Sequence, residues 1–185
     1  MKLLLVAAGL IAALTRADVE RAVNFARWPH TDAERARFHS QYVTKFAVPP
    51  AHAGPVVESI DVLTPYRRLE KMAEGHEQLH DMWARGGAYS DAETAIAPFT
   101  GRVSIVARVY FGLLTVATPD AQVQVPGIEP LSTNMTSIAC GDSICGGDYE
   151  AVFDAADLGQ FVHMIRVLWG GRELARTTAD FRVLQ

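Results

Sequence analysis

The sequence predicts an α+β protein in which N-terminal helices are followed by an antiparallel β-sandwich or open barrel of about six to seven strands. Two observations lead to this prediction. Helix-start signals and apolar residues at helical spacing occupy much of the first hundred residues. From residue 102 onward, apolar and polar residues alternate, and Gly and Pro turns separate six strand candidates. Because the helices precede the strands, this order is typical of α+β folds.

The first seventeen residues have the layout of a secretory signal peptide. Lys2 precedes an unbroken apolar run over residues 3–14, and Thr15 and Ala17 place small residues at the −3 and −1 positions of a cleavage site. Such a run is too short for a stable membrane anchor. We therefore expect a signal peptide at 1–17, a secreted or periplasmic protein, and no transmembrane segment after signal cleavage. The alternative is a buried N-terminal helix.

The remaining 168 residues can form one domain with a sizeable core. Their sequence divides into a helical region with one strand, residues 18–100, and an antiparallel β domain, residues 101–185. Asp18 can begin a short helix over residues 18–27. A capping box at Thr31 and Glu34 predicts the start of a second helix, in which aromatic residues recur every four positions up to Phe46.

A β-branched run predicts a strand over residues 56–63. Thr64 then supplies a capping side chain and Pro65 the first helical position, which strongly favours a helix start. We expect this helix to reach about residue 85, where two glycines end it. A further capping box, which starts at Ser90, predicts a brief helix through residue 97.

The β domain begins with an alternating stretch over residues 103–111. Gly170 and Gly171 predict a hairpin turn, because glycine takes positive φ without steric cost. The further extended stretches lie at 121–125, 131–139, 149–154, 161–169 and 173–178.

Cys140 and Cys145 are the only two cysteines and enclose four residues. In an oxidising compartment, such a pair is most simply a disulfide that fixes a loop between two strands. A catalytic redox pair is the less favoured interpretation, because such pairs usually enclose two residues at a helix start.

His76, Glu77 and His80 form an H-E-x-x-H string within the third expected helix. Residues four apart share a helix face, so two imidazoles can bind one zinc ion while the glutamate activates bound water. No third ligand follows at the spacing of the peptidase families, although Glu93 is a candidate. The alternatives are two packed histidines or a mixed zinc site that adds Cys140 and Cys145. We assign no catalytic residue, metal ligand or cofactor, and we keep zinc with these residues as the alternative.

Arg67 and Arg68 lie in the first turn of the same helix, where the helix dipole disfavours cations. They form either an anion clamp or ion pairs with nearby carboxylates, and the sequence favours ion pairs. The candidate partners are Glu58, Asp61, Glu70 and Glu74.

The charge balance restricts the classes of partner. Removal of residues 1–17 leaves 15 basic and 21 acidic side chains, a net charge of −6, which argues against nucleic acid. We expect an exported, soluble, non-enzymatic binding or interaction module of the cell envelope, with an unknown protein or small-molecule ligand. A small zinc-dependent hydrolase is the alternative, so the sequence leaves enzymatic activity open.

Three segments, at residues 62–69, 153–158 and 171–176, resemble parts of uncharacterised exported bacterial proteins of unknown function. This resemblance implies a bacterial periplasmic setting. It implies no activity and no site residue.

Overall fold

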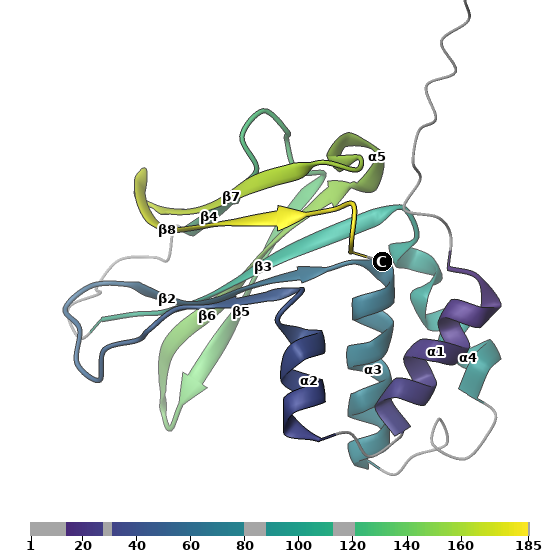
Figure 1. Ribbon diagram of the computed structural model, residues 1–185. Helices are drawn as coiled ribbons and strands as arrows, with labels where there is room; N and C mark the ends of the chain where they lie inside the picture. The colour runs from purple at the N-terminus through teal and green to yellow at the C-terminus, as the bar shows by residue number, and fades with distance from the viewer. Residues whose placement is uncertain (1–13, 28–30, 80–87, 113–120, 185) are drawn as a thin grey trace, which may run out of the picture.

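Two antiparallel sheets and a group of helices make up the computed structural model of the protein (Figure 1). The structure describes residues 14–27, 31–79, 88–112 and 121–184. The strand order is β1-β2-β3-β6-β5 in the larger sheet and β4-β7-β8 in the smaller one. The α+β prediction is therefore confirmed, with eight strands in the described residues and two open sheets instead of a closed barrel.

The first helix begins two residues earlier than expected. Helix α1 spans Arg16–Arg27. Its cap is Thr15, whose hydroxyl accepts from the Asp18 N–H at 3.2 Å, while the Thr15 N–H donates to the Asp18 carboxylate at 2.8 Å. The expected signal-cleavage bond, between Ala17 and Asp18, therefore lies in the first turn of α1. Residues 1–13 of the expected signal peptide lie outside the described residues.

Helix α2 spans Asp32–His39, and its predicted capping box at Thr31 and Glu34 is confirmed. The expected continuation to Phe46 is wrong. Ser40 caps the helix C-terminus, and β1, Val43–Lys45, follows and pairs with β2. Pairing with a neighbouring strand overrides the helical spacing of the aromatic residues, because β-branched residues favour an extended strand.

Strand β2, Val56–Leu63, lies where the sequence predicts it. Helix α3, Pro65–Leu79, begins as expected, with the Thr64 hydroxyl accepting from the Arg67 N–H at 3.2 Å. The last part of the expected helix falls in residues 80–87, which lie outside the described residues. Helix α4, Ala88–Ile96, starts before Ser90, so Ser90 lies inside the helix instead of capping it. A 3-10 turn, η2 (Ala97–Phe99), follows.

The second half of the chain supplies most of the strands. They are β3 (Arg102–Tyr110), β4 (Ala121–Gln124), β5 (Ser132–Cys140), β6 (Ser143–Asp154), β7 (Val162–Trp169) and β8 (Arg172–Asp180). Gly170 and Gly171, both at positive φ, form the predicted turn between β7 and β8. A one-turn helix that the sequence analysis missed, α5 (Ala155–Leu158), starts after Asp154, whose carboxylate accepts from the Ala156 N–H.

Strand β6 is six residues longer than expected, because Gly146 and Gly147 belong to it. A Cβ atom on Gly146 would lie 2.6 Å from the carbonyl oxygen of Val109 in β3. The glycine therefore marks a close approach of two strands, although in the sequence it looks like part of a loop.

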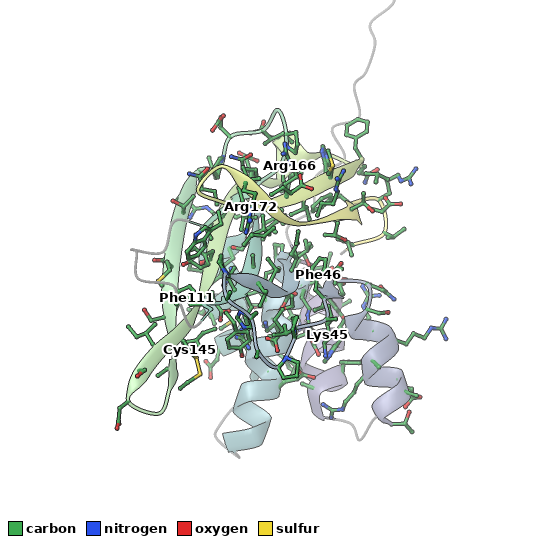
Figure 2. All side chains as sticks on the ribbon, turned by 90° about the vertical axis from the view of Figure 1, so that its left-hand side faces the viewer. Lys45, Phe46, Phe111, Cys145, Arg166 and Arg172 are labelled. Atoms are coloured by element: carbon green, nitrogen blue, oxygen red, sulfur yellow. A yellow bond between two sulfur atoms is a disulfide. The ribbon has the colours of Figure 1, made fainter. Side chains whose placement is uncertain are left out.

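The main core lies between the two sheets, whose facing side chains fill the space (Figure 2). Strand β2 belongs to the first hundred residues and pairs with β3, which follows residue 100. Both halves of the chain therefore contribute strands to the larger sheet. A second apolar cluster joins α1, α3 and α4 at one end of the molecule. Fully buried core side chains include Ile60, Val103, Ile105, Val109, Phe153, Ile165 and Val167 between the sheets, and Val19, Val23 and Leu69 in the helix cluster.

Candidate functional site

A cavity of about 660 Å³ opens where β4 of the smaller sheet lies beside β5 and β6 of the larger sheet. We call it the β4–β5 pocket, and it is lined by residues 121–130, 133–135, 149 and 150. The chain between β4 and β5 makes a tight turn here, in which the Ile128 N–H donates to the Val125 carbonyl at 3.0 Å and Gly127 takes a positive φ. The volume lies within the range of small-ligand sites.

The β4–β5 pocket is lined by both polar and apolar residues. Val123, Val125 and Tyr149 are buried in the inter-sheet core, and the chain segments that carry them form one side of the cavity. Thr133 and Asn134 are exposed on β5 and contribute hydroxyl and amide groups. Hydrogen-bonding groups that converge on a pocket orient a ligand and give specificity. The polar and charged lining residues are Gln122, Gln124, Glu129, Thr133, Asn134 and Glu150.

The two charged residues that line the pocket, Glu129 and Glu150, are both acidic. The Glu150 carboxylate forms an ion pair with Arg68 of α3. The Arg68 guanidinium lies 2.8 Å from this carboxylate and 2.6 Å from the Ser104 hydroxyl. The same guanidinium stacks on the Phe99 ring, 4.1 Å from its centroid. Arg68 therefore forms an ion pair, as the sequence favours, but with a partner that the sequence analysis did not name.

Strand β5, which forms one wall of the pocket, is also an edge of the larger sheet. Among the described residues, no strand pairs with its second edge. Its sequence, STNMTSIAC, contains no Lys, Arg or Pro, and its register shift, between Ile138 and Ala139, lies outside the stretch that lines the pocket. Natural edge strands are commonly protected from strand addition by such residues. The polar pocket and an unprotected strand edge thus lie side by side.

A second group of polar side chains is buried where α2 and β2 approach α3. Arg67 and Glu70 of α3 are 3% and 0% exposed and form an ion pair. The Arg67 guanidinium also lies 5.8 Å from the Phe38 ring centroid and 5.7 Å from that of Tyr42. Burial raises the pKa of Glu70 to about 7, and the nearby Arg67 charge offsets only part of this rise. The ion pair that the sequence favours for Arg67 is confirmed.

His39, the last residue of α2, reaches the same place. Its Nε2 lies 3.7 Å from Glu70 Oε1 and 3.7 Å from Glu74 Oε1. Desolvation, followed by the positive charge of Arg67, lowers the pKa of His39. His39, Glu70 and Glu74 form the His39–Glu70–Glu74 cluster, in which one potential ligand atom from each residue lies within 4.8 Å of the other two.

The zinc alternative from the sequence lies largely outside what the structure describes. His76 and Glu77 belong to the backbone of α3, but their side chains fall outside the described part, and His80 lies outside the described residues. The zinc site at these residues therefore stays a prediction. Glu93 is an exposed residue of α4.

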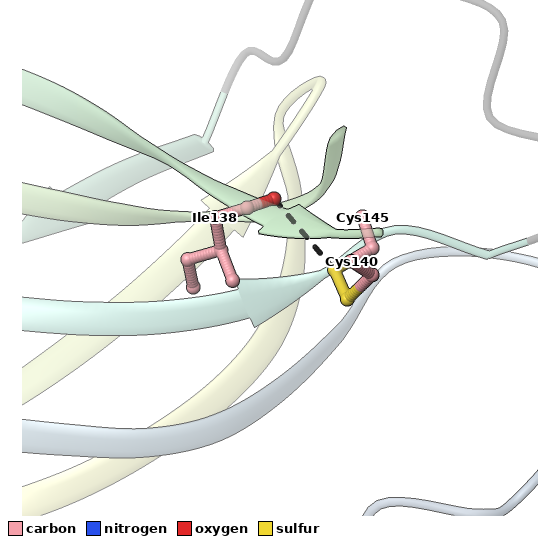
Figure 3. Close-up of a disulfide and its surroundings, with 3 residues drawn as sticks. All are labelled: Ile138, Cys140 and Cys145. Carbon is pink, nitrogen blue, oxygen red and sulfur yellow. Dashed lines mark hydrogen bonds between the residues drawn. A yellow bond between two sulfur atoms is a disulfide. The ribbon is translucent and has the colours of Figure 1, made fainter. Parts of the chain in front are cut away.

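Cys140 and Cys145 form the expected disulfide, which links the last residue of β5 to the third residue of β6 beside the hairpin turn (Figure 3). Their Cα atoms are 5.6 Å apart. Cys145 Sγ contacts the Ile138 carbonyl oxygen at 3.6 Å, but a disulfide sulfur has no proton to donate. Because the two sulfurs are bonded to each other, a mixed zinc site with Cys140 and Cys145 as thiolate ligands is wrong for this structure.

Replacing both cysteines, Cys140→Ser with Cys145→Ser, should lower the free energy of unfolding by about 2 kcal/mol, because the short closed ring no longer restricts the unfolded chain. Urea unfolding followed by circular dichroism measures this change. The double variant should have the same stability with and without reductant, whereas the native chain should lose stability on reduction. An unchanged native midpoint on full reduction would contradict the prediction.

No family model, curated protein or solved structure matches the chain in the comparisons with known proteins. The resemblance to exported bacterial proteins therefore stays a prediction. No helix in the described ranges is both long and apolar enough to cross a membrane.

Sequence reasoning missed both the pocket and the cluster. The pocket combines β4, a turn and two strands of the other sheet, so no local motif marks it. Glu70 and Glu74 are four residues apart on α3, a spacing that places them on one helix face. From the sequence, this spacing indicated only ion-pair partners for the neighbouring arginines. The structure adds His39 of α2, which lies beside both glutamates.

Proposed function

We propose that the protein is an exported, non-enzymatic binding module of the cell envelope, and that its ligand is an extended peptide segment held at the β4–β5 pocket. The observation that carries this proposal is the position of the pocket beside the unprotected edge of β5. An added strand gains affinity from main-chain hydrogen bonds along such an edge, and a neighbouring pocket selects among its side chains.

The lining favours a particular class of peptide. Its amide and hydroxyl groups can donate and accept hydrogen bonds. Its exposed charged side chain, Glu129, is a carboxylate, whereas the Glu150 carboxylate is already paired with Arg68. A peptide with uncharged or basic side chains fits this surface, whereas an acidic peptide meets like charge. Pro126, Ile128 and Met135, which also line the pocket, offer apolar surface to an aliphatic side chain.

Two observations support the exported setting. The first seventeen residues have the pattern of a signal peptide. The Cys140–Cys145 disulfide is of a kind that persists in oxidising compartments. Cleavage after Ala17 removes the Thr15 cap of α1 and leaves the Asp18 carboxylate at the new N-terminus, where it still complements the helix dipole.

A random library of twelve-residue peptides, displayed on phage and selected on the native protein, tests the binding proposal. We expect enrichment of peptides with few acidic residues. Thr133→Trp should weaken the enriched peptides at least about tenfold by filling the pocket, which corresponds to about 1.4 kcal/mol. Thr133 lines the pocket and is exposed, so the substitution should not disturb the core.

Thr136→Trp is the matched control, because Thr136 is exposed on the same strand but is not part of the pocket lining. Affinities measured by isothermal titration should stay within about twofold of the native value in this variant. Equal binding by the native protein and Thr133→Trp, or no enriched peptide, would contradict the proposed site.

A further inference from the structure

We propose that His39, Glu70 and Glu74 form a binding site for one divalent transition-metal ion, with zinc as the best-matched metal. The site is separate from the β4–β5 pocket and from the H-E-x-x-H string. It combines the end of α2 with two residues one helical turn apart on α3.

The distances between the ligand atoms suit a small ion. His39 Nε2 lies 3.7 Å from one carboxylate oxygen of Glu70 and 3.7 Å from one of Glu74. Ligands bound at about 2 Å around a tetrahedral zinc ion lie roughly 3.4 Å from one another. The two carboxylate oxygens lie within 4.8 Å of each other, so the side chains must draw closer together around the ion. One imidazole and two carboxylates also suit zinc.

An unpartnered buried atom points to a ligand at this place. Glu70 is fully buried, and no donor among the described residues hydrogen-bonds to its Oε1, which faces His39. Its other polar neighbour is the Glu74 carboxyl group, whose proximity helps to raise the pKa of Glu70. His39 Nε2 is also shielded from solvent and without a hydrogen bond. Buried polar atoms in this state are rare and costly, and a bound cation would satisfy both at once.

The surrounding charges leave room for the ion. Arg67 binds the other oxygen of Glu70, which orients the carboxylate and leaves Oε1 for the metal. Arg35 of α2 is the competing cation, with Nη1 3.4 Å from Glu74 Oε1. Its side chain is 39% exposed, so it can turn into solvent when the ion binds. Asp61 of β2 pairs with Lys71 through one oxygen and adds negative charge nearby.

The His39–Glu70–Glu74 cluster lies at the edge of the buried region, because the side chains of His39 and Glu74 are 33% and 17% exposed, whereas Glu70 is fully covered. Three protein ligands leave a tetrahedral zinc ion one further position, which a water molecule can take.

Titration of zinc chloride into the untagged, chelator-treated full chain, followed by isothermal calorimetry, tests the site. We expect one ion per chain, release of protons on binding and a higher melting temperature. Glu74→Gln and His39→Gln should each weaken binding at least about 100-fold, because a ligand of the ion is lost. Cobalt(II) provides a second measurement, since its visible spectrum should change in the same variants.

Glu93→Gln, an identical substitution at an exposed glutamate of α4, should bind zinc like the native chain. His76→Ala should also keep native affinity. Circular dichroism checks that Glu74→Gln folds. If Glu74→Gln does not fold, the zinc affinity of His39→Gln tests the site instead. Absence of zinc binding by the native chain would overturn the proposal. So would zinc binding that survives both Glu74→Gln and His39→Gln. If His76→Ala then abolished zinc binding, the ion would lie at the H-E-x-x-H string instead.

Discussion

Replacing Arg67 with alanine is expected to lower the free energy of unfolding by about 3–5 kcal/mol at pH 8, because the substitution leaves a buried carboxylate without its partner. Glu70 is 0% exposed, and its ion pair with Arg67 lies beneath α2. The variant also loses the contacts of the guanidinium with the Phe38 and Tyr42 rings. The loss should be smaller at pH 5, where Glu70 takes up a proton and needs no counter-charge.

Arg68→Ala is the matched control for this prediction. Arg68 is the next residue in the same helical turn, but its side chain is 19% exposed and pairs with a partly exposed Glu150. Its loss should cost about 1–2 kcal/mol, since water can replace part of the interaction. Urea unfolding of both variants in the presence of chelator makes the comparison. A larger loss for Arg68→Ala than for Arg67→Ala would contradict the role given to the buried pair.

A double variant separates burial from pairing. Arg67→Met with Glu70→Leu replaces the ion pair with apolar side chains of similar length. We expect this double variant to regain most of the stability that Arg67→Ala loses, because a buried pair often contributes little net free energy even though one unpaired partner costs much. If the double variant were as unstable as Arg67→Ala, the packing around the guanidinium would account for the loss.

Local signals predicted much of this fold. The Thr64–Pro65 helix start, the capping box at Thr31 and the glycine hairpin at residues 170–171 depend on neighbours within a few residues. The alternation over β3 likewise reports directly which side chains face the core. The disulfide followed from two nearby cysteines and an export pattern. In each case, residues within a short stretch of the sequence are sufficient to predict the local structure.

The errors share a different cause, which is contact between distant segments. Helix α2 ends at His39 because β1 pairs with β2. No residue near Ser40 predicts that pairing from the local sequence. Strand β6 includes Gly146 because β3 lies against it. The His39–Glu70–Glu74 cluster has the same origin, since α2 places its histidine beside two residues that the sequence analysis named only as candidate ion-pair partners.

Glu70 should make the fold less stable as pH rises from about 4.5 to about 7. Its pKa is about 7 in the folded chain and near 4.5 when unfolded, so the folded chain binds the extra proton throughout this range. Its contribution is complete below pH 4.5 and is lost as pH rises through 7. By the linkage relation, the loss is on the order of 3 kcal/mol. Glu70→Gln keeps the neutral shape and should remove this dependence.

The comparison of the native chain with Glu70→Gln is needed because neighbouring groups titrate too. His39 has a lowered pKa in the folded chain, so its contribution has the opposite sign and is lost as pH falls. Glu74 belongs to the same cluster, and Arg35 and Asp61 lie close to it. The difference between the two stability profiles, measured by urea unfolding with chelator from pH 5 to 8, isolates Glu70. We expect Glu70→Gln to be less stable than, or equal to, the native chain at pH 5 and to gain relative stability towards pH 8. Parallel profiles would show that Glu70 keeps its charge in the folded chain, and that Arg67 compensates for its burial completely.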